Sequence, residues 1–268
     1  MNIAGIINQQ TTQKPIEDAL VDAILNAIKV QNPPSRSTKA NVKPSKMGCD
    51  RQMYYILTQA TPNEVSTVDP KLVMIQKTGT FIHSMLQEAM AKAAPQGIVF
   101  RDPKEVAQLA AEKGINTKIV PATHSTDNPY EVHCYNEDYD LSFMWDGAVY
   151  FKELNTIIEI KSEDHFKWMK RTRPEDNHIE QATCYSLGLG INTVIFLYVN
   201  RNYMSIKGYK VPISDEMRQT VRDHITSVKA KVAAKELPKK VTCKSCKYCD
   251  YTKACKADVN PLLAKPEE

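Results

Sequence analysis

The chain has 268 residues, of which 42% are hydrophobic and 25% charged, and its formal net charge is +4. This length suffices for a full hydrophobic core and favours one domain with appendages, or at most two. The composition excludes global disorder, and no run approaches the roughly 18 apolar residues of a membrane-spanning helix. The first residues do not form a secretory signal, so we expect a reducing cytoplasm in which the seven cysteines are not paired as disulfides.

The N-terminal part is predicted to be mostly helical. Residues 16–30 carry apolar side chains at a four-residue spacing, which is typical of one helical face. A loop rich in proline, serine and lysine follows over residues 31–46. Further helices are expected over residues 47–59 and 70–93. We therefore expect a helical N-terminal layer.

The middle of the chain changes to strand-like patterns. Five segments are predicted to be strands: residues 130–135, 140–151, 155–162, 193–199 and 205–211. A helix is expected over residues 175–189. Another is expected to begin after Ser214, a residue type that caps helices, and to run to about residue 235. The order predicts a mixed α/β core.

Two carboxylates and a lysine lie in the predicted strands. Asp146 is expected in one strand, and Glu159 and Lys161 in the next, where a two-residue spacing puts their side chains on the same side. Ile158 and Ile160 would face the opposite, buried side. A hairpin between the strands would bring Asp146 beside the pair. Two carboxylates can hold Mg²⁺ or Mn²⁺, and a lysine can stabilise a phosphate in its transition state, although an ordinary solvated strand face has the same pattern.

Two helical pairs flank these strands in the sequence. Gly79 precedes His83 by one turn, so the helix can approach another element closely and the imidazole can serve as a further metal ligand. Gln181 and Tyr185 share a face of a later helix, where they can hold a DNA backbone or brace the lysine. His178 lies on nearly the same face and is a weaker candidate. The alternative for both pairs is ordinary helix surface or core.

In chain order these residues form G-x-x-x-H, then D, then E-x-K, then Q-x-x-x-Y. This set resembles the RecB-type nuclease family of the PD-(D/E)xK superfamily. The resemblance implies a restriction-endonuclease-like core, with a mixed central sheet flanked by helices. It also implies that His83, Asp146 and Glu159 hold the metal and that Lys161 assists catalysis.

The C-terminal tail is rich in cysteine and lysine. Its four cysteines are Cys243, Cys246, Cys249 and Cys255. Cys-x-x-Cys spacings let neighbouring thiolates converge on one metal, so these four can form a zinc site without help from the rest of the chain. The remaining pair in the middle of the chain, Cys134 and Cys184, is predicted to lie in the core.

A second arrangement uses Cys49, which lies far upstream. One early cysteine followed by C-x2-C-x5-C is similar to the Fe–S subgroup of the same family, found in AddB-type nuclease domains and CRISPR-associated exonucleases. That resemblance implies a 4Fe-4S cluster. Its ligands would be Cys49, Cys246, Cys249 and Cys255. Cys243 can replace Cys49 as the first ligand, and we favour Cys49.

The resemblance divides the chain into an N-terminal helical segment (residues 1–69), a nuclease core (70–236) and a Cys-rich tail (237–268) that packs with the first segment as one unit. It implies a metal-dependent DNA exonuclease acting in recombination, repair or CRISPR-type processing, with a protein partner from such a pathway. Phages carry genes of this family too. Basic residues such as Lys46 and Arg51 would contact DNA phosphates. Ring-like oligomers, both polarities of digestion and both single- and double-stranded DNA are compatible with the motifs.

An alternative from another class is a non-catalytic module that binds nucleic acid or assists assembly, with a zinc or Fe–S centre. The presence of all the catalytic residue types argues against it. A zinc-dependent regulator would account only for the tail.

Overall fold

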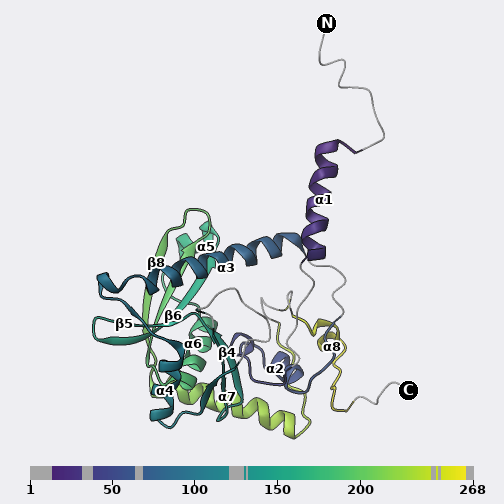
Figure 1. Cartoon of the computed structure of the whole chain (residues 1–268). Helices are drawn as coiled ribbons and strands as arrows, with labels where there is room; N and C mark the ends of the chain where they lie inside the picture. Colours follow the sequence, from purple (N-terminus) through teal and green to yellow (C-terminus); the bar gives the residue numbers. More distant parts are fainter. Residues whose placement is uncertain are drawn as a thin grey trace. The chain divides into compact units, whose positions relative to one another are not determined.

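A computed structural model describes residues 14–31, 39–63, 69–120, 130, 132–242, 246 and 249–263 (Figure 1). The contacts divide the chain into two compact units, one of residues 1–36 with 64–77 and one of residues 37–63 with 78–268. The first unit contains α1 (Ile16–Gln31), which is helical as predicted, and the start of α3 (Pro70–Ala91). The division predicted from the sequence, after residues 69 and 236, is not tested by these two units. The predicted N-terminal layer stays a prediction.

A five-stranded mixed sheet forms the centre of the second unit. Its strands are β1 (Val99–Phe100), β5 (Ala148–Phe151), β6 (Leu154–Glu163), β7 (Thr193–Asn200) and β8 (Ile206–Pro212), in that spatial order. β6 and β7 are parallel, and every other neighbouring pair is antiparallel. A parallel pair needs a long crossover, which α5 (His165–Lys170) and α6 (Asp176–Leu189) provide here.

A second sheet of three antiparallel strands lies earlier in the chain. It contains β2 (Thr117–Ile119), β3 (Val132–Asn136) and β4 (Leu141–Trp145). The prediction of one strand over residues 140–151 is therefore wrong, because the chain leaves this sheet after β4 and enters the other at β5. Gly147, with φ of 140°, lies at the break, and a Cβ there would be 2.6 Å from Phe100 Cζ. The sequence had led us to expect Asp146 in a strand, and this prediction is wrong, because Asp146 lies in the break between β4 and β5.

Helices pack on both faces of the five-stranded sheet. Ile82 of α3 packs with Ile158 and Ile160 of β6, and all three are buried. On the other face, Tyr185 of α6 belongs to a larger core that includes Ile157. β6 is therefore buried on both faces, as is usual for a strand with a parallel neighbour. This arrangement confirms the predicted mixed α/β core of a mixed sheet flanked by helices.

Two more helices complete the second unit. α7 (Asp215–Ala233) begins at Ser214, whose hydroxyl accepts a hydrogen bond from Met217 N at 3.1 Å, as the sequence predicts. α4 (Pro103–Glu112) was not predicted, although Asp102 caps it and Pro103 occupies its first position. In the described part of the chain, no helix has both the length and the apolar character needed to cross a membrane.

The C-terminal tail is hydrogen-bonded to α2 (Asp50–Leu57). This helix follows the 3-10 turn η2 (Pro44–Lys46), has Cys49 as its N-cap and begins three residues later than predicted. Tyr54 OH donates to Asn260 Oδ1 and Tyr55 OH donates to Val259 O, both at 3.0 Å. Asn63 also donates to the Thr252 hydroxyl at the start of α8 (Thr252–Lys256). These bonds tie segments about 200 positions apart in the sequence.

Candidate active site

Asp146 is held by three groups from two elements. Its Oδ1 lies 3.0 Å from His83 Nδ1, and its Oδ2 accepts a hydrogen bond of 2.6 Å from Ile160 N. Its backbone carbonyl accepts a hydrogen bond of 2.7 Å from Gln87 Nε2. The strand break at Gly147 thus fixes the carboxylate between α3 and β6.

The small residue Gly79 lets α3 approach the sheet closely, as the sequence predicts. A Cβ on Gly79 would lie 3.3 Å from Ser162 Oγ, near the end of β6, which is tighter than most side-chain contacts. One turn later His83 reaches Asp146, and one turn after that Gln87 does too. The helix therefore presents its polar residues along one face.

Glu159 and Lys161 project from β6 on the same side, as predicted. Lys161 Nζ lies 2.5 Å from Glu159 Oε1. The Glu159 residue is only 2% exposed, whereas the Lys161 side chain is 22% exposed. The lysine therefore forms the accessible end of the pair, and the carboxylate lies behind it.

Burial and charge together perturb both groups. Burial raises the pKa of Glu159 to about 7; the Lys161 charge opposes this and repulsion by Asp146 adds to it. Burial lowers the pKa of Lys161, but the attraction of Glu159 and then Asp146 outweighs burial and raises that pKa overall. Lys161 therefore stays charged, and one cation faces two carboxyl groups.

Gln181 and Tyr185 brace the lysine from α6. Gln181 Oε1 accepts a hydrogen bond of 3.1 Å from Lys161 Nζ, and its Nε2 donates to Tyr185 OH at 2.5 Å. Tyr185 is 3% exposed and stacks on Phe143, with ring centroids 5.5 Å apart. Of the two roles expected for this pair, the geometry favours bracing the lysine. Tyr185 acts through Gln181 and is too buried to reach a substrate.

His178, the weaker candidate on the same helix, points elsewhere. Its Nδ1 lies 2.8 Å from Tyr198 OH. Burial, followed by the charge of Lys161, lowers its pKa to about 4, so the imidazole is neutral near pH 7. Among the described residues, His178 contacts neither Asp146 nor Glu159. It forms an ion-pair contact only with Glu175, at 4.0 Å.

Sequence reasoning missed Gln87 and a buried ion pair. Gln87 is fully buried, and its four-residue spacing from His83 was the available signal. Arg171 forms two hydrogen bonds of 2.7 Å, from Nε and Nη2, to the carboxylate of Glu163 at the end of β6. No sequence pattern marked this pair, because it joins a strand end to the residue just after α5.

The donor types around Asp146 suit a hard divalent cation. Carboxylate oxygens of Asp146 and Glu159 and an imidazole nitrogen of His83 lie in one region. Lys161 supplies a single positive charge against these two carboxyl groups. In the described part of the chain, no three His, Cys, Asp or Glu side chains are placed as ligands of one ion. The oxygens of Asp146 are taken up by His83 and Ile160 N instead.

Three of the predicted cluster cysteines lie in one region. Burial raises the pKa of Cys249, and the neighbouring Cys49 and Cys255 thiolates raise it further. Cys249 and Cys255 also pack against Tyr55 and Tyr251. Cys246 is described by itself, with its thiol 3.8 Å from a backbone oxygen of the tail, and Cys243 lies outside the described residues.

Arg51 lies beside these thiols with unused donors. It is 3% exposed, and its Nε and Nη1 have no hydrogen-bond partner among the described residues. Its Nη2 contacts Asp258, and the charge of Cys255 acts on it. Buried arginine donors of this kind suit an additional anionic group. Cys134 and Cys184 are buried in the core, as predicted.

No protein-family model matches the chain, and no curated protein matches it in sequence. Among solved structures it is similar to SSO0001, at 12% identity and a TM-score of 0.48, over 91% of this chain and 100% of that chain. It is also similar to an alkaline exonuclease, LHK-Exo, from Laribacter hongkongensis, at 13% identity and a TM-score of 0.36, over 82% and 95% of the two chains. The structure of LHK-Exo in complex with dAMP is 14% identical, with a TM-score of 0.35, over 81% of this chain and 95% of that chain. All three likenesses are distant, with identities of 12–14% and TM-scores below 0.5.

Proposed function

We propose that the chain is a metal-dependent nuclease that hydrolyses phosphodiester bonds at DNA ends. The observation that carries the proposal is the convergence of Asp146, Glu159 and Lys161, with Gln181 holding the lysine. An ordinary solvated strand face would not bury a glutamate beside a second carboxylate. The ordered motifs of the RecB-type family give the same residues these roles.

His83, Asp146 and Glu159 would hold Mg²⁺ or Mn²⁺. When bound, the cation neutralises negative charge on the scissile phosphate and lowers the pKa of a water molecule. The chain's own residues supply the orientation. Lys161 Nζ, charged and partly exposed, is placed to donate hydrogen bonds to a phosphate oxygen, while Gln181 and Tyr185 keep it from turning away.

The cleavage test uses labelled linear DNA with Mn²⁺ or Mg²⁺. We expect the wild type to release nucleotides, and Asp146→Asn and Lys161→Ala to lose at least about a hundredfold in rate, because each removes preorganised charge from the transition state. Lys210→Ala, an exposed lysine on β8, is the matched control and should retain full activity. Absence of cleavage by the wild type with either metal, or undiminished cleavage by Asp146→Asn, would overturn the proposal.

We also propose that Cys49, Cys246, Cys249 and Cys255 hold a structural 4Fe-4S cluster. The proximity of three of these thiols and the unused Arg51 donors support an anionic metal–thiolate centre. Such a centre would close a loop of about two hundred residues and so stabilise the fold. The proposal includes a reducing compartment, in which thiolates of this kind persist.

Anaerobically purified protein should then be brown and contain iron. Cys49→Ser should lose iron, whereas Cys243→Ser should keep it. If only Cys243→Ser loses iron, the first ligand is Cys243 and not Cys49. A colourless protein with stoichiometric zinc would overturn the iron–sulfur cluster in favour of a zinc site. Recombination, repair and CRISPR-type DNA processing are the pathways that we propose for such an enzyme, with a protein partner from one of them.

A further inference from the structure

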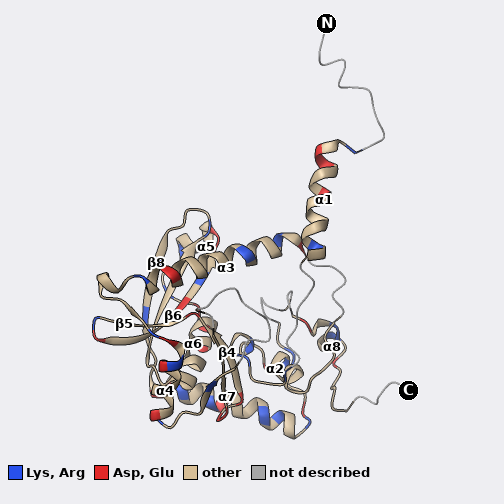
Figure 2. Ribbon diagram, viewed as in Figure 1, with Lys and Arg blue, Asp and Glu red and all other residues tan. Residues whose placement is uncertain are grey.

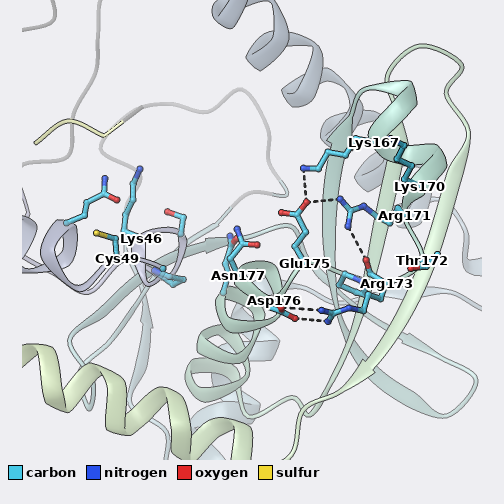
Figure 3. A pocket seen from close by; sticks show the side chains of 16 residues that line it. Lys46, Cys49, Lys167, Lys170, Arg171, Thr172, Arg173, Glu175, Asp176 and Asn177 are labelled. Carbon is cyan, nitrogen blue, oxygen red and sulfur yellow. Dashed lines mark hydrogen bonds and ion pairs between the residues drawn. The ribbon is translucent and has the colours of Figure 1, made fainter. Parts of the chain in front are cut away.

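A cleft of about 800 Å³ lies between two segments of the second unit (Figure 3). One wall consists of residues 44–46, 48, 49 and 52, from η2 into α2. The other consists of residues 167 and 170–177, from α5 to the start of α6. Gln181, which accepts a hydrogen bond from Lys161, also lines it. The cleft therefore reaches the side chain that positions Lys161.

The lining of the cleft is strongly cationic. Its five cationic side chains are Lys46, Lys167, Lys170, Arg171 and Arg173. Only two acidic residues line it, Glu175 and Asp176. The whole chain has a net charge of only +4, and Figure 2 shows Lys and Arg mixed with Asp and Glu over the other elements. The local excess of positive charge in the cleft is thus large for this protein.

Part of this charge is used to build the wall. Arg171 pairs with the buried Glu163 and, at 2.8 Å, with Glu175, and its guanidinium lies 4.1 Å from the centre of the Tyr198 ring. Lys167 lies 2.8 Å from the same Glu175. These contacts fix the course of the chain after α5, so the cationic wall is preorganised.

Other cations of the cleft remain available to a ligand. Lys46 and Lys170, on opposite walls, form no ion pair within the described part of the chain. Arg173 pairs with Asp176, but both side chains are more than half exposed, and an exposed pair of this kind is weak enough to exchange for another anion. Hydroxyl and amide groups of Ser45 and Asn177 add neutral donors.

We propose that this cleft binds the sugar–phosphate backbone of a single DNA strand whose neighbouring phosphodiester lies at Lys161. The inference deepens the proposed nuclease function, on which it rests, by naming the single strand as the substrate. Lysine, arginine, hydroxyl and amide donors are the groups that contact phosphate and sugar. None of the lining residues is aromatic, so the cleft contacts the backbone and reads no base sequence.

The size of the cleft favours one strand over a duplex. Its volume lies within the range of roughly 300–1,000 Å³ typical of sites for single small ligands. A few nucleotides of one flexible strand can enter a space of this size between two walls. A stacked duplex presents both backbones on a rigid convex surface and would contact only the rim.

The test is strand binding by Lys46→Gln/Lys170→Gln, measured by fluorescence anisotropy with a labelled 12-nucleotide strand in a chelating buffer. We expect at least a tenfold loss of affinity at low salt. The slope of log affinity against log salt should fall by about 1.4, because each lost phosphate contact of a single strand contributes about 0.7. The control is Lys104→Gln/Lys210→Gln, which has the same charge change at exposed positions outside the cleft.

Two further measurements separate this inference from the proposed function. Hydrolysis of bis(p-nitrophenyl) phosphate, a small phosphodiester that does not fill the cleft, should proceed with the same kcat in the wild type and in the control variant Lys104→Gln/Lys210→Gln, and it reports on the proposed function without the cleft. Strand binding through the cleft without hydrolysis of any phosphodiester by the wild type would overturn the proposed function alone. Equal strand affinities of the cleft variant and the control variant would overturn the inference. A duplex that binds the wild type as tightly as the strand, with the same loss in the variant, would overturn the choice of a single strand.

Discussion

Removing the charge of Glu159 is expected to stabilise the protein at pH 8 when divalent cations are chelated. Glu159 is buried and faces Asp146, and its pKa is raised from 4.5 to about 7. A carboxyl group with a raised pKa favours the folded state when it is protonated. That contribution is fully present below pH 4.5 and is lost as the pH rises through about 7. Glu159→Gln keeps a neutral, similarly shaped side chain at every pH.

The magnitude follows from the same pKa. Each tenfold preference for the neutral form is worth about 1.4 kcal/mol, so the full difference corresponds to roughly 3 kcal/mol. Local relaxation of the folded state reduces this value, and we expect Glu159→Gln to gain on the order of 2 kcal/mol at pH 8 and almost nothing at pH 4.5. For a chain of this size the gain raises Tm by roughly 4–8 °C.

The assay is thermal unfolding of wild type and variant in EDTA at pH 4.5 and pH 8. Glu163→Gln is the matched control on the same strand. Its carboxylate is paired with Arg171, so removing its charge should destabilise the protein at pH 8 by about 3 kcal/mol or more. A lower Tm for Glu159→Gln than for the wild type at pH 8, or an equal gain at both pH values, would refute the reasoning.

Three further predictions concern residues around the site. Carboxylates on α6 and at the start of α2 raise the pKa of His224 to about 9. The contribution of His224 to stability is therefore full below pH 6.5 and is lost as the pH rises through 9. At pH 6 the free energy of unfolding of His224→Gln should be about 1–2 kcal/mol below that of the wild type, and at pH 10 the two should be equal. Tyr185→Phe should lower kcat about tenfold without changing KM for a small phosphodiester, because it frees Gln181 only. Gln87→Leu should cost about 1–3 kcal/mol in urea unfolding, because it leaves the buried carbonyl of Asp146 without this donor. Unchanged pH dependence, kcat or unfolding midpoint, respectively, would contradict each of these.

Much of the fold could be predicted because its local patterns agree with its packing. The helices at residues 16–30, 70–93 and 175–189 match α1, α3 and α6 to within two residues at each end. The two-residue period of strands correctly placed Glu159 and Lys161 on one face. The buried cysteines of the core also followed from their ordinary behaviour as small apolar side chains.

The rest depends on contacts that no local pattern encodes. Asp146 was expected in a strand because residues 140–151 look continuous, yet Gly147 and the ring of Phe100 divide them between two sheets. Ile158 and Ile160 were expected to face the only buried side, but the parallel pairing of β6 with β7 buries both faces. The cleft could not be foreseen either, since its walls come from residues more than a hundred positions apart.

The most direct measurement is digestion of linear DNA labelled at one end and, alongside it, covalently closed circular DNA, in Mn²⁺. We expect the wild type to release mononucleotides or short fragments from the linear DNA and to spare the circle, and Lys161→Ala to leave both intact. Equal cutting of the circle, or digestion by Lys161→Ala at the wild-type rate, would contradict an exonuclease site built on Asp146, Glu159 and Lys161.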